Sequence, residues 1–246
     1  MSNFKFDTHA HLDLYKNSSD VIKYIEENRS YTIAVTNLPI LYQKYTKQYQ
    51  DLKYVRFALG LHPELVFQYK EQIPSMIEYI KDAKYIGEVG LDYVTQDIEN
   101  RETQREAFRK LVEECDKYGG KLLSIHSRRA VNDVLSILGD SFNGKVILHW
   151  FSGSLKELIT ATELGCYFSI NSDMIGSKKG VELIKKMPLD RILIESDAPF
   201  TKDTMKNYSL DFVFKIVEAV SQIKGVEFEL VNRIFENNFK QLLVKL

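Results

Sequence analysis

Short runs of β-branched and aromatic residues alternate along the chain with longer stretches in which apolar positions recur at helical spacing. The short runs predict eight strands, at Phe4–Thr8, Tyr31–Asn37, Val55–Leu61, Tyr85–Glu88, Lys121–His126, Lys145–His149, Cys166–Ile170 and Arg191–Glu195. The longer stretches predict helices at Ser19–Arg29, Glu64–Asp82, Arg101–Lys117, Ala130–Leu138, Leu155–Leu164, Lys178–Lys186, Leu210–Ile223 and Glu227–Lys245. Because strands that alternate with helices run parallel and are joined by crossover helices, this pattern predicts an α/β fold.

The number of strand–helix units favours one architecture, a single-domain TIM-type (β/α)8 barrel spanning residues 1–246. The 246 residues match the roughly 250 that such a barrel needs, and no Pro-, Gly- or Ser-rich linker divides them. An open doubly wound sheet is the alternative, but such a sheet carries a Gly-rich phosphate loop after its first strand. Here the first strand ends instead in the polar sequence Asp7-Thr8-His9-Ala10-His11.

The composition, 44% hydrophobic and 27% charged, belongs to a chain that can bury a sizeable core, which excludes an intrinsically disordered protein. A net charge of −1 argues against a protein that binds long duplexes through many lysines. Two cysteines cannot build a disulfide framework, and we expect Cys115 and Cys166 to be buried thiols. No apolar run reaches the roughly 18 residues of a membrane span, and the N-terminal sequence lacks a signal-peptide core, so we expect a cytoplasmic protein.

All the histidines of the chain lie at or just after predicted strand ends, at His9, His11, His62, His126 and His149. Two acids, Glu88 and Asp197, occupy comparable places. Because the carboxyl ends of parallel strands meet on one face of a barrel, we expect these side chains to converge. Taken singly, each is as well explained by core packing or an ion pair, but their joint placement predicts a site for divalent cations with nitrogen and oxygen ligands.

Six motifs resemble the TatD family, metal-dependent deoxyribonucleases with a TIM-type barrel in the amidohydrolase-like superfamily. They occur in the family's order, as Asp7-Thr8-His9-Ala10-His11-Leu12-Asp13, Gly60-Leu61-His62-Pro63, Gly87-Glu88-Val89-Gly90-Leu91-Asp92-Tyr93, His126-Ser127-Arg128, His149-Trp150-Phe151-Ser152-Gly153 and Glu195-Ser196-Asp197-Ala198-Pro199. The resemblance therefore spans residues 7 to 199.

The resemblance implies a site for two divalent metal ions, which can be Mg²⁺, Mn²⁺ or Zn²⁺. By this resemblance one ion is held by His9, His11, Glu88 and Asp197. The second ion is held by Glu88, His126 and His149, so that Glu88 bridges the two. His62 lies beside them to contact substrate or leaving group, and Asp197 is the expected general base that takes a proton from the attacking water.

Further side chains near these motifs are candidates for substrate binding. Arg128 is expected to reach a phosphate oxygen, and a solvent-facing arginine is the alternative. Asp92 is expected either to orient a metal-bound histidine or to cap a turn. Four aromatic residues are expected to stack on bases or to pack the barrel, namely Tyr93, Trp150, Phe151 and Phe200. Stacking with few basic residues predicts a DNA exonuclease that acts on single-stranded or frayed ends.

Two features leave other functions open. The segment Phe200–Tyr208 lacks the Asn-Glu-Pro sequence that many TatD proteins have there. An amidohydrolase-like enzyme for a small amide, ester or phosphoester is therefore the alternative, and a catalytically silent binding subunit is a third. The segments Leu14–Asn17 and Thr36–Pro39 also resemble the TatD-type component of a bacterial antiphage system, Qat. That resemblance implies protein partners in a defence complex.

Overall fold

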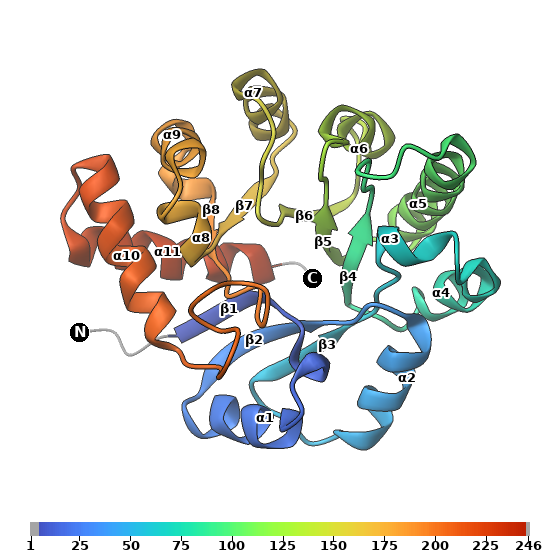
Figure 1. The fold of residues 1–246 in the computed structure, drawn as a ribbon, viewed down its shortest axis with the longest axis horizontal. Coiled ribbons are helices and arrows are strands. Elements are labelled where there is room, and N and C mark those ends of the chain that lie inside the picture. The colour runs from blue at the N-terminus through green and yellow to red at the C-terminus, as the bar shows by residue number, and fades with distance from the viewer. Residues whose placement is uncertain (1–4, 245–246) are drawn as a thin grey trace. The chain divides into compact units, whose positions relative to one another are not determined.

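The computed structural model describes residues 5–244 and contains strands at all the predicted places (Figure 1). They are β1 (Lys5–Ala10), β2 (Ser30–Val35), β3 (Val55–Ala58), β4 (Tyr85–Gly90), β5 (Lys121–His126), β6 (Gly144–Leu148), β7 (Tyr167–Ile170) and β8 (Ile192–Ile194). Every strand pair with a determined register is parallel. The predicted α/β fold is thus confirmed; Phe4, part of the first predicted strand, lies outside the described residues.

Most of the predicted helices are also present, with bounds that differ by a few residues. They are α1 (Ser18–Glu27), α5 (Ile98–Tyr118), α6 (Val131–Leu138), α7 (Leu155–Glu163), α9 (Lys178–Lys186), α10 (Asp211–Lys224) and α11 (Phe228–Leu243). None of the helices formed by residues 5–244 is long and apolar enough to cross a membrane.

The helix predicted for Glu64–Asp82 is wrong as a single element. The segment forms α3 (Pro63–Val66), the 3-10 helix η2 (Lys70–Gln72) and α4 (Ile73–Tyr79). Pro74 occupies the first turn of α4, where the missing N–H is tolerated, whereas inside a longer helix it would remove a hydrogen bond.

Four short elements were not expected from the sequence. They are α2 (Pro39–Gln48), α8 (Ser172–Ile175), and the 3-10 helices η1 (Leu12–Leu14) and η3 (Leu189–Arg191). The start of α2 carries a recognisable signal, because Pro39 occupies its first turn, where proline is favoured.

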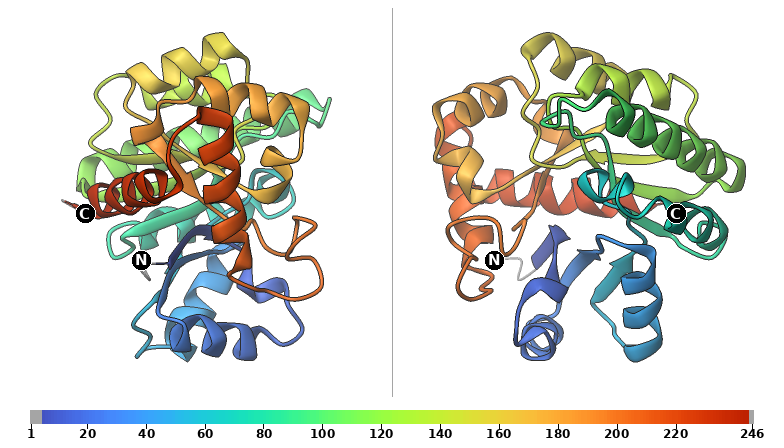
Figure 2. Two further views of the ribbon diagram at one scale, coloured as in Figure 1. Left: turned by 90° about the vertical axis from the view of Figure 1, so that its left-hand side faces the viewer. Right: turned by 45° about the vertical axis from the view of Figure 1, so that its right-hand side comes forward.

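The described chain divides into two compact units. Unit 1 comprises residues 5–34, 52–56 and 167–244, and unit 2 comprises residues 35–51 and 57–166. In unit 1, β1 pairs with β2 and β7 pairs with β8, while a bridge between Ala10 and Ala198 joins β1 to the segment that follows β8. Helices α10 and α11 pack on each other within the same unit (Figure 2). The assignment of residues 1–246 to a single domain stays a prediction.

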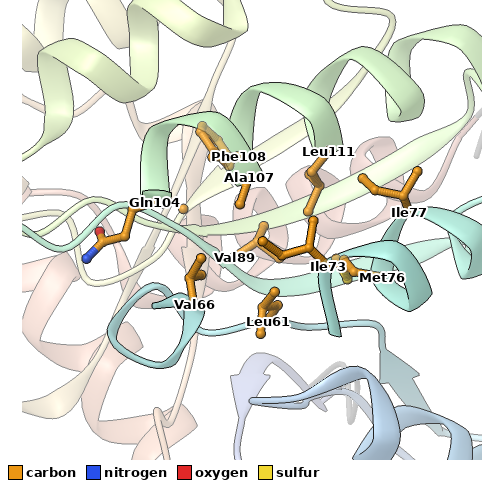
Figure 3. Close-up of a pocket in the computed structure, with 11 residues that line it drawn as sticks. Leu61, Val66, Ile73, Met76, Ile77, Val89, Gln104, Ala107, Phe108 and Leu111 are labelled. Carbon is orange, nitrogen blue, oxygen red and sulfur yellow. The ribbon is translucent and has the colours of Figure 1, made fainter. Parts of the chain in front are cut away.

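Unit 2 is likewise built on parallel strands. Strand β4 pairs with β5 and β5 with β6, and a bridge from Leu59 to Ile86 brings the segment after β3 beside β4. Helix α5 packs over β4 around a small, mostly apolar cavity of about 10 Å³ (Figure 3). Gln104 is the polar residue of this lining, and its Oε1 accepts the backbone N–H of Asp92 at 2.8 Å. Helix α5 thereby holds the segment after β4 in place.

Candidate metal-binding clusters

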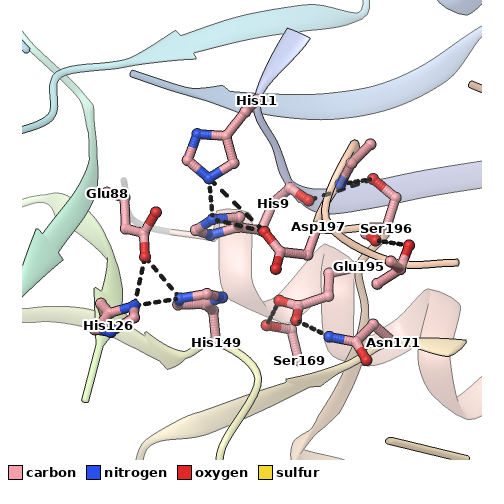
Figure 4. Close-up of polar contacts among 12 residues, drawn as sticks. His9, His11, Glu88, His126, His149, Ser169, Asn171, Glu195, Ser196 and Asp197 are labelled. Atoms are coloured by element: carbon pink, nitrogen blue, oxygen red, sulfur yellow. Dashed lines mark hydrogen bonds and ion pairs between the residues drawn. The ribbon is translucent and has the colours of Figure 1, made fainter. Parts of the chain in front are cut away.

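The first cluster lies in unit 1 and consists of His9, His11 and Asp197, all buried (Figure 4). Residues two apart on an extended strand point to the same side, which brings the Nε2 atoms of His9 and His11 to 3.3 Å. Asp197 Oδ1 lies 3.6 Å from the first of these nitrogens and 3.7 Å from the second. The point equidistant from the three atoms lies about 2 Å from each, which is the bond length of zinc to imidazole nitrogen and carboxylate oxygen.

Local backbone contacts hold this triangle. The N–H of Asp197 donates to the carbonyl of His9 at 2.9 Å, and the N–H of His11 donates to the carbonyl of Ala198 at 2.8 Å. Asp197 adopts a left-handed conformation with φ of 45°, uncommon for a residue with a side chain, which aims its carboxylate at the two imidazoles. The donor set therefore fits a divalent cation.

Asp7 supports the same segment from within the core of unit 1. Its carboxylate accepts hydrogen bonds from the backbone N–H of His9 at 3.1 Å, the N–H of Ser196 at 2.9 Å and the hydroxyl of Tyr208 at 2.8 Å. Burial raises the pKa of Asp7 to about 6, although these hydrogen bonds oppose the shift. One carboxyl group thus ties together the two segments that carry the ligands.

The second cluster lies in unit 2 around Glu88, which is buried near the end of β4. Its Oε1 lies 2.7 Å from Nδ1 of His126 and 2.9 Å from Nε2 of His149 (Figure 4). The same oxygen lies 3.2 Å from Nε2 of His62. Three imidazoles from three different segments therefore meet at one carboxylate oxygen. His62, Glu88 and His126 together satisfy the spacing of a metal-binding group.

Asp92 fixes the orientation of His126, as one of the two sequence-based alternatives proposed. Its Oδ2 lies 2.8 Å from Nε2 of His126, while its Oδ1 accepts the N–H of Val94 at 2.7 Å. The proton on Nε2 therefore points at Asp92, and Nδ1 faces Glu88. A carboxylate that orients a ligating histidine in this way is the usual second partner of such a ligand.

His126 and Asp92 each shift the pKa of the other toward its charged form. Burial lowers the pKa of His126, but hydrogen bonds to Asp92 and Glu88 outweigh it, so that the pKa is raised. Burial likewise favours a higher pKa for Asp92, but the hydrogen bond from His126, the N–H of Val94 and the charge of Arg128 together lower it. The two carboxylates therefore favour the protonated form of the His126 imidazole.

Besides His62, three predicted substrate-binding side chains of unit 2 differ in their surroundings. The side chain of Arg128 is 55% exposed, with Nη1 3.9 Å from Asp92 and 4.0 Å from a carboxylate oxygen of Glu64. Tyr93 donates its hydroxyl to Asp133 at 2.5 Å, and the guanidinium of Arg101 lies over its ring. Trp150 follows His149 directly and is partly exposed.

Two further observations bear on the aromatic candidates. Phe151 is 1% exposed, in agreement with the packing alternative for this residue. Phe200, in unit 1, is 53% exposed, and its ring meets that of His11 edge-on with 5.2 Å between centroids.

Glu195 is a buried polar residue of unit 1 that was not singled out from the sequence. Glu195 is 0% exposed and accepts hydrogen bonds from the hydroxyl of Ser169 and, at 3.0 Å, from the amide of Asn171 (Figure 4). A signal was present, because Glu195 lies two residues before Asp197 in the same motif. The partners come from β7 and the residue after it, and this contact depends on the pairing of β7 with β8.

Parallel strands that carry buried imidazoles and carboxylates at metal-binding spacing are typical of metal-dependent enzymes, and the relatives of this chain include metal-dependent hydrolases. The comparison with protein families identifies the particular family. The chain belongs to the TatD family, because the family model of the TatD related DNases matches residues 6–244. The resemblance seen in the six motifs is therefore confirmed.

Individual relatives agree with this assignment. The chain is 30% identical to the uncharacterized metal-dependent hydrolase BU355 of Buchnera aphidicola, covering 97% of this chain and 98% of that one. It is 25% identical to the human deoxyribonuclease TATDN3, covering 98% and 94%. The crystal structure of YJJV, a TatD homolog from Escherichia coli, superposes with a TM-score of 0.83 at 20% identity, over 98% and 97% of the chains. That likeness shows that the fold is the one of TatD proteins.

Proposed function

We propose that this protein hydrolyses phosphodiester bonds of DNA with divalent cations, as an exonuclease that acts on single-stranded or frayed ends. The single observation that carries the proposal is the triangle of His9, His11 and Asp197, whose spacing suits a cation at about 2 Å. Membership of the TatD family and the deoxyribonuclease named among its relatives support the choice of DNA.

The proposed ligands are those that the family resemblance implies. By that resemblance His9, His11 and Asp197 would hold one cation, His126 and His149 would hold a second, and Glu88 would contribute to both ligand sets. His62 contacts the substrate or its leaving group, because its Nε2 lies 3.2 Å from the Glu88 carboxylate and its side chain is 16% exposed.

Divalent cations at these ligands would neutralise the negative charge of the phosphodiester, which otherwise repels a nucleophile. They would also lower the pKa of water, so that hydroxide is available at neutral pH. The side chains of this protein do the rest. The carboxylate of Asp197 accepts the proton of the attacking water. The guanidinium of Arg128, which is exposed and lies 3.9 Å from Asp92 and 4.0 Å from Glu64, binds a non-bridging phosphate oxygen. Tyr93 and Trp150 offer rings to unpaired bases.

The choice of single-stranded ends follows from charge. A net charge of −1 supplies few cationic contacts for a long duplex, whereas stacking on aromatic rings needs little charge. The protein partners implied by the resemblance to the Qat component, and a cytoplasmic location, stay predictions from the sequence.

The test uses the protein freed of metal by chelation and then supplied separately with Mg²⁺, Mn²⁺ or Zn²⁺. Substrates are end-labelled single-stranded DNA, a blunt duplex, a duplex with frayed ends and a closed circular single strand. We expect stepwise shortening of the linear single strand and the frayed duplex, with the circle left intact. Cleavage of the circle would show an endonuclease.

Variants complete this experiment. Glu88→Ala and Asp197→Asn should remove the activity, while Glu163→Gln, an exposed acid on α7, should retain it. Absence of DNA cleavage with every metal, combined with hydrolysis of a small nitrophenyl ester or phosphoester, would replace this proposal by the amidohydrolase-like alternative.

A further inference from the structure

The loop between β8 and α10, residues 199–208, has two kinds of positions (orange in Figures 1 and 2). Phe200 and Met205 are exposed by 53% and 60%, which is unusual for large apolar side chains. The lysines of the same loop, at 202 and 206, are also exposed. Three other positions of the loop, Thr201, Thr204 and Tyr208, are buried.

The buried polar residues anchor the loop to the segments that carry the first metal cluster. Thr201 donates its hydroxyl to the carbonyl of Ser196 at 2.8 Å, next to Asp197. The hydroxyl of Tyr15 donates to the carbonyl of Thr204 at 2.5 Å. Together with the hydrogen bond from Tyr208 to Asp7, these contacts hold the loop in one conformation beside the cluster.

Phe200 is the part of the loop that reaches the cluster. Its ring stands at 86° to the ring of His11, with 5.2 Å between the centroids, which is an edge-to-face contact. More than half of the Phe200 side chain remains exposed. An aromatic ring fixed at a candidate ligand, with its surface still accessible, is suited to stack on a base without selecting its identity.

The charges of the loop suit the backbone of the same ligand. Lys202 and Lys206 follow Phe200 by two and six residues. Of the nearby acids, Asp203 is paired with Lys215 at 3.1 Å, and the carboxylate of Asp173 accepts the backbone N–H of Lys202. Both lysine side chains are therefore placed to meet phosphates.

We propose that residues 199–208 form a subsite for the unpaired terminal nucleotide of a DNA strand. The base stacks on Phe200, and Lys202 and Lys206 bind the adjoining phosphates. The proposal rests on the nuclease function proposed above and adds to it the side chains that select an unpaired end.

The experiment compares two single strands of equal length, one with an ordinary terminal nucleotide and one whose terminal nucleotide lacks a base. Phe200→Ala should lower kcat/KM on the ordinary strand by about tenfold, ~1.4 kcal/mol, and leave the abasic strand unchanged. Phe200→Trp, which keeps an aromatic ring, should retain the wild-type difference in kcat/KM between the ordinary and the abasic strand. Changing both Lys202 and Lys206 to Ala should lessen the dependence of log(kcat/KM) on log[salt] by about 0.7 per lysine.

Phe214→Ala is the matched control, because Phe214 is 59% exposed in the same unit but lies on α10. It should behave as the wild type on both strands. Metal affinity is measured for every variant. Equal losses on both strands together with weaker metal binding would show that Phe200 only positions His11, and would overturn the subsite.

The remaining outcomes separate the two proposals. If the wild type shortens DNA and Phe200→Ala does so equally well, the subsite is wrong and the nuclease function stands. If the wild type cleaves neither strand, the nuclease function fails and the subsite fails with it.

Discussion

The contact between Asp92 and His126 leads to a prediction about metal binding. It tests whether Asp92 acts by setting the tautomer of His126 or only through its negative charge. In Asp92→Asn the side chain keeps one oxygen and gains an amide nitrogen. The oxygen has to remain at the Oδ1 position, because it accepts the N–H of Val94 there at 2.7 Å. The amide nitrogen must then face Nε2 of His126, which forces the lone pair onto Nε2 and the proton onto Nδ1. A proton on Nδ1 points at Glu88, where the ligand lone pair is needed.

The magnitude follows from the lost hydrogen bond. A hydrogen bond to a charged group contributes about 1.5–3 kcal/mol, which corresponds to roughly 10- to 100-fold in affinity. Losses of this size are typical when the partner of a ligating histidine is changed. We expect Asp92→Ala to weaken metal binding about tenfold, since His126 can then adopt either tautomer. Asp92→Asn should weaken it about 100-fold, because the wrong tautomer is imposed.

The assay is competition for Zn²⁺ against a chromophoric chelator at pH 7.5, combined with ¹⁵N spectra of labelled histidine that report the tautomer of His126. Asp133→Asn is the control, because Asp133 lies in the same unit and accepts a hydrogen bond from Tyr93 instead. Asp92→Asn binding Zn²⁺ more tightly than Asp92→Ala would refute the reasoning about the tautomer.

Three further predictions concern stability. The Lys121 ammonium donates to the carbonyls of Ile80 at 2.6 Å, Ala83 at 2.9 Å and Lys81 at 3.2 Å, so Lys121→Met should lower the free energy of unfolding in urea by about 2–4 kcal/mol; a change under 0.5 kcal/mol would contradict this. Tyr208→Phe removes a donor from the buried Asp7 carboxylate and should cost about 1–3 kcal/mol by the same measurement, whereas Tyr118→Phe, at a 46% exposed side chain, should cost little. Chelation of bound metal should lower Tm by about 5–10 °C, because a ligand at 100 times its Kd contributes ~2.7 kcal/mol; an unchanged Tm in a metal-saturated sample would count against the clusters as metal sites.

Strand prediction succeeded because it depends on local pattern. Strands such as β5 and β7 are short, largely apolar runs that are buried on both faces, and such runs are visible in the sequence. The helix predicted from 64 to 82 failed because apolar spacing continues across residues 67–72, whereas the α-helix ends at Val66 and a new one begins at Ile73, with Pro74 in its first turn. Helix α2 was missed because only two of its residues, Pro39 and Tyr45, are buried, which leaves little periodicity to detect.

The sequence by itself determined the identity of the candidate ligands and their places at strand ends, because both follow from residue type and from a period of two along an extended chain. The separation of His9 and His11 by two residues was enough to predict that they face the same side. Only the tertiary structure decided the partners of these ligands. Asp197 lies 188 residues from His9, and Asp92 lies 34 residues from His126. Distances between such residues depend on how parallel strands pair and how helices hold the loops between them, and no local pattern in the chain contains that information.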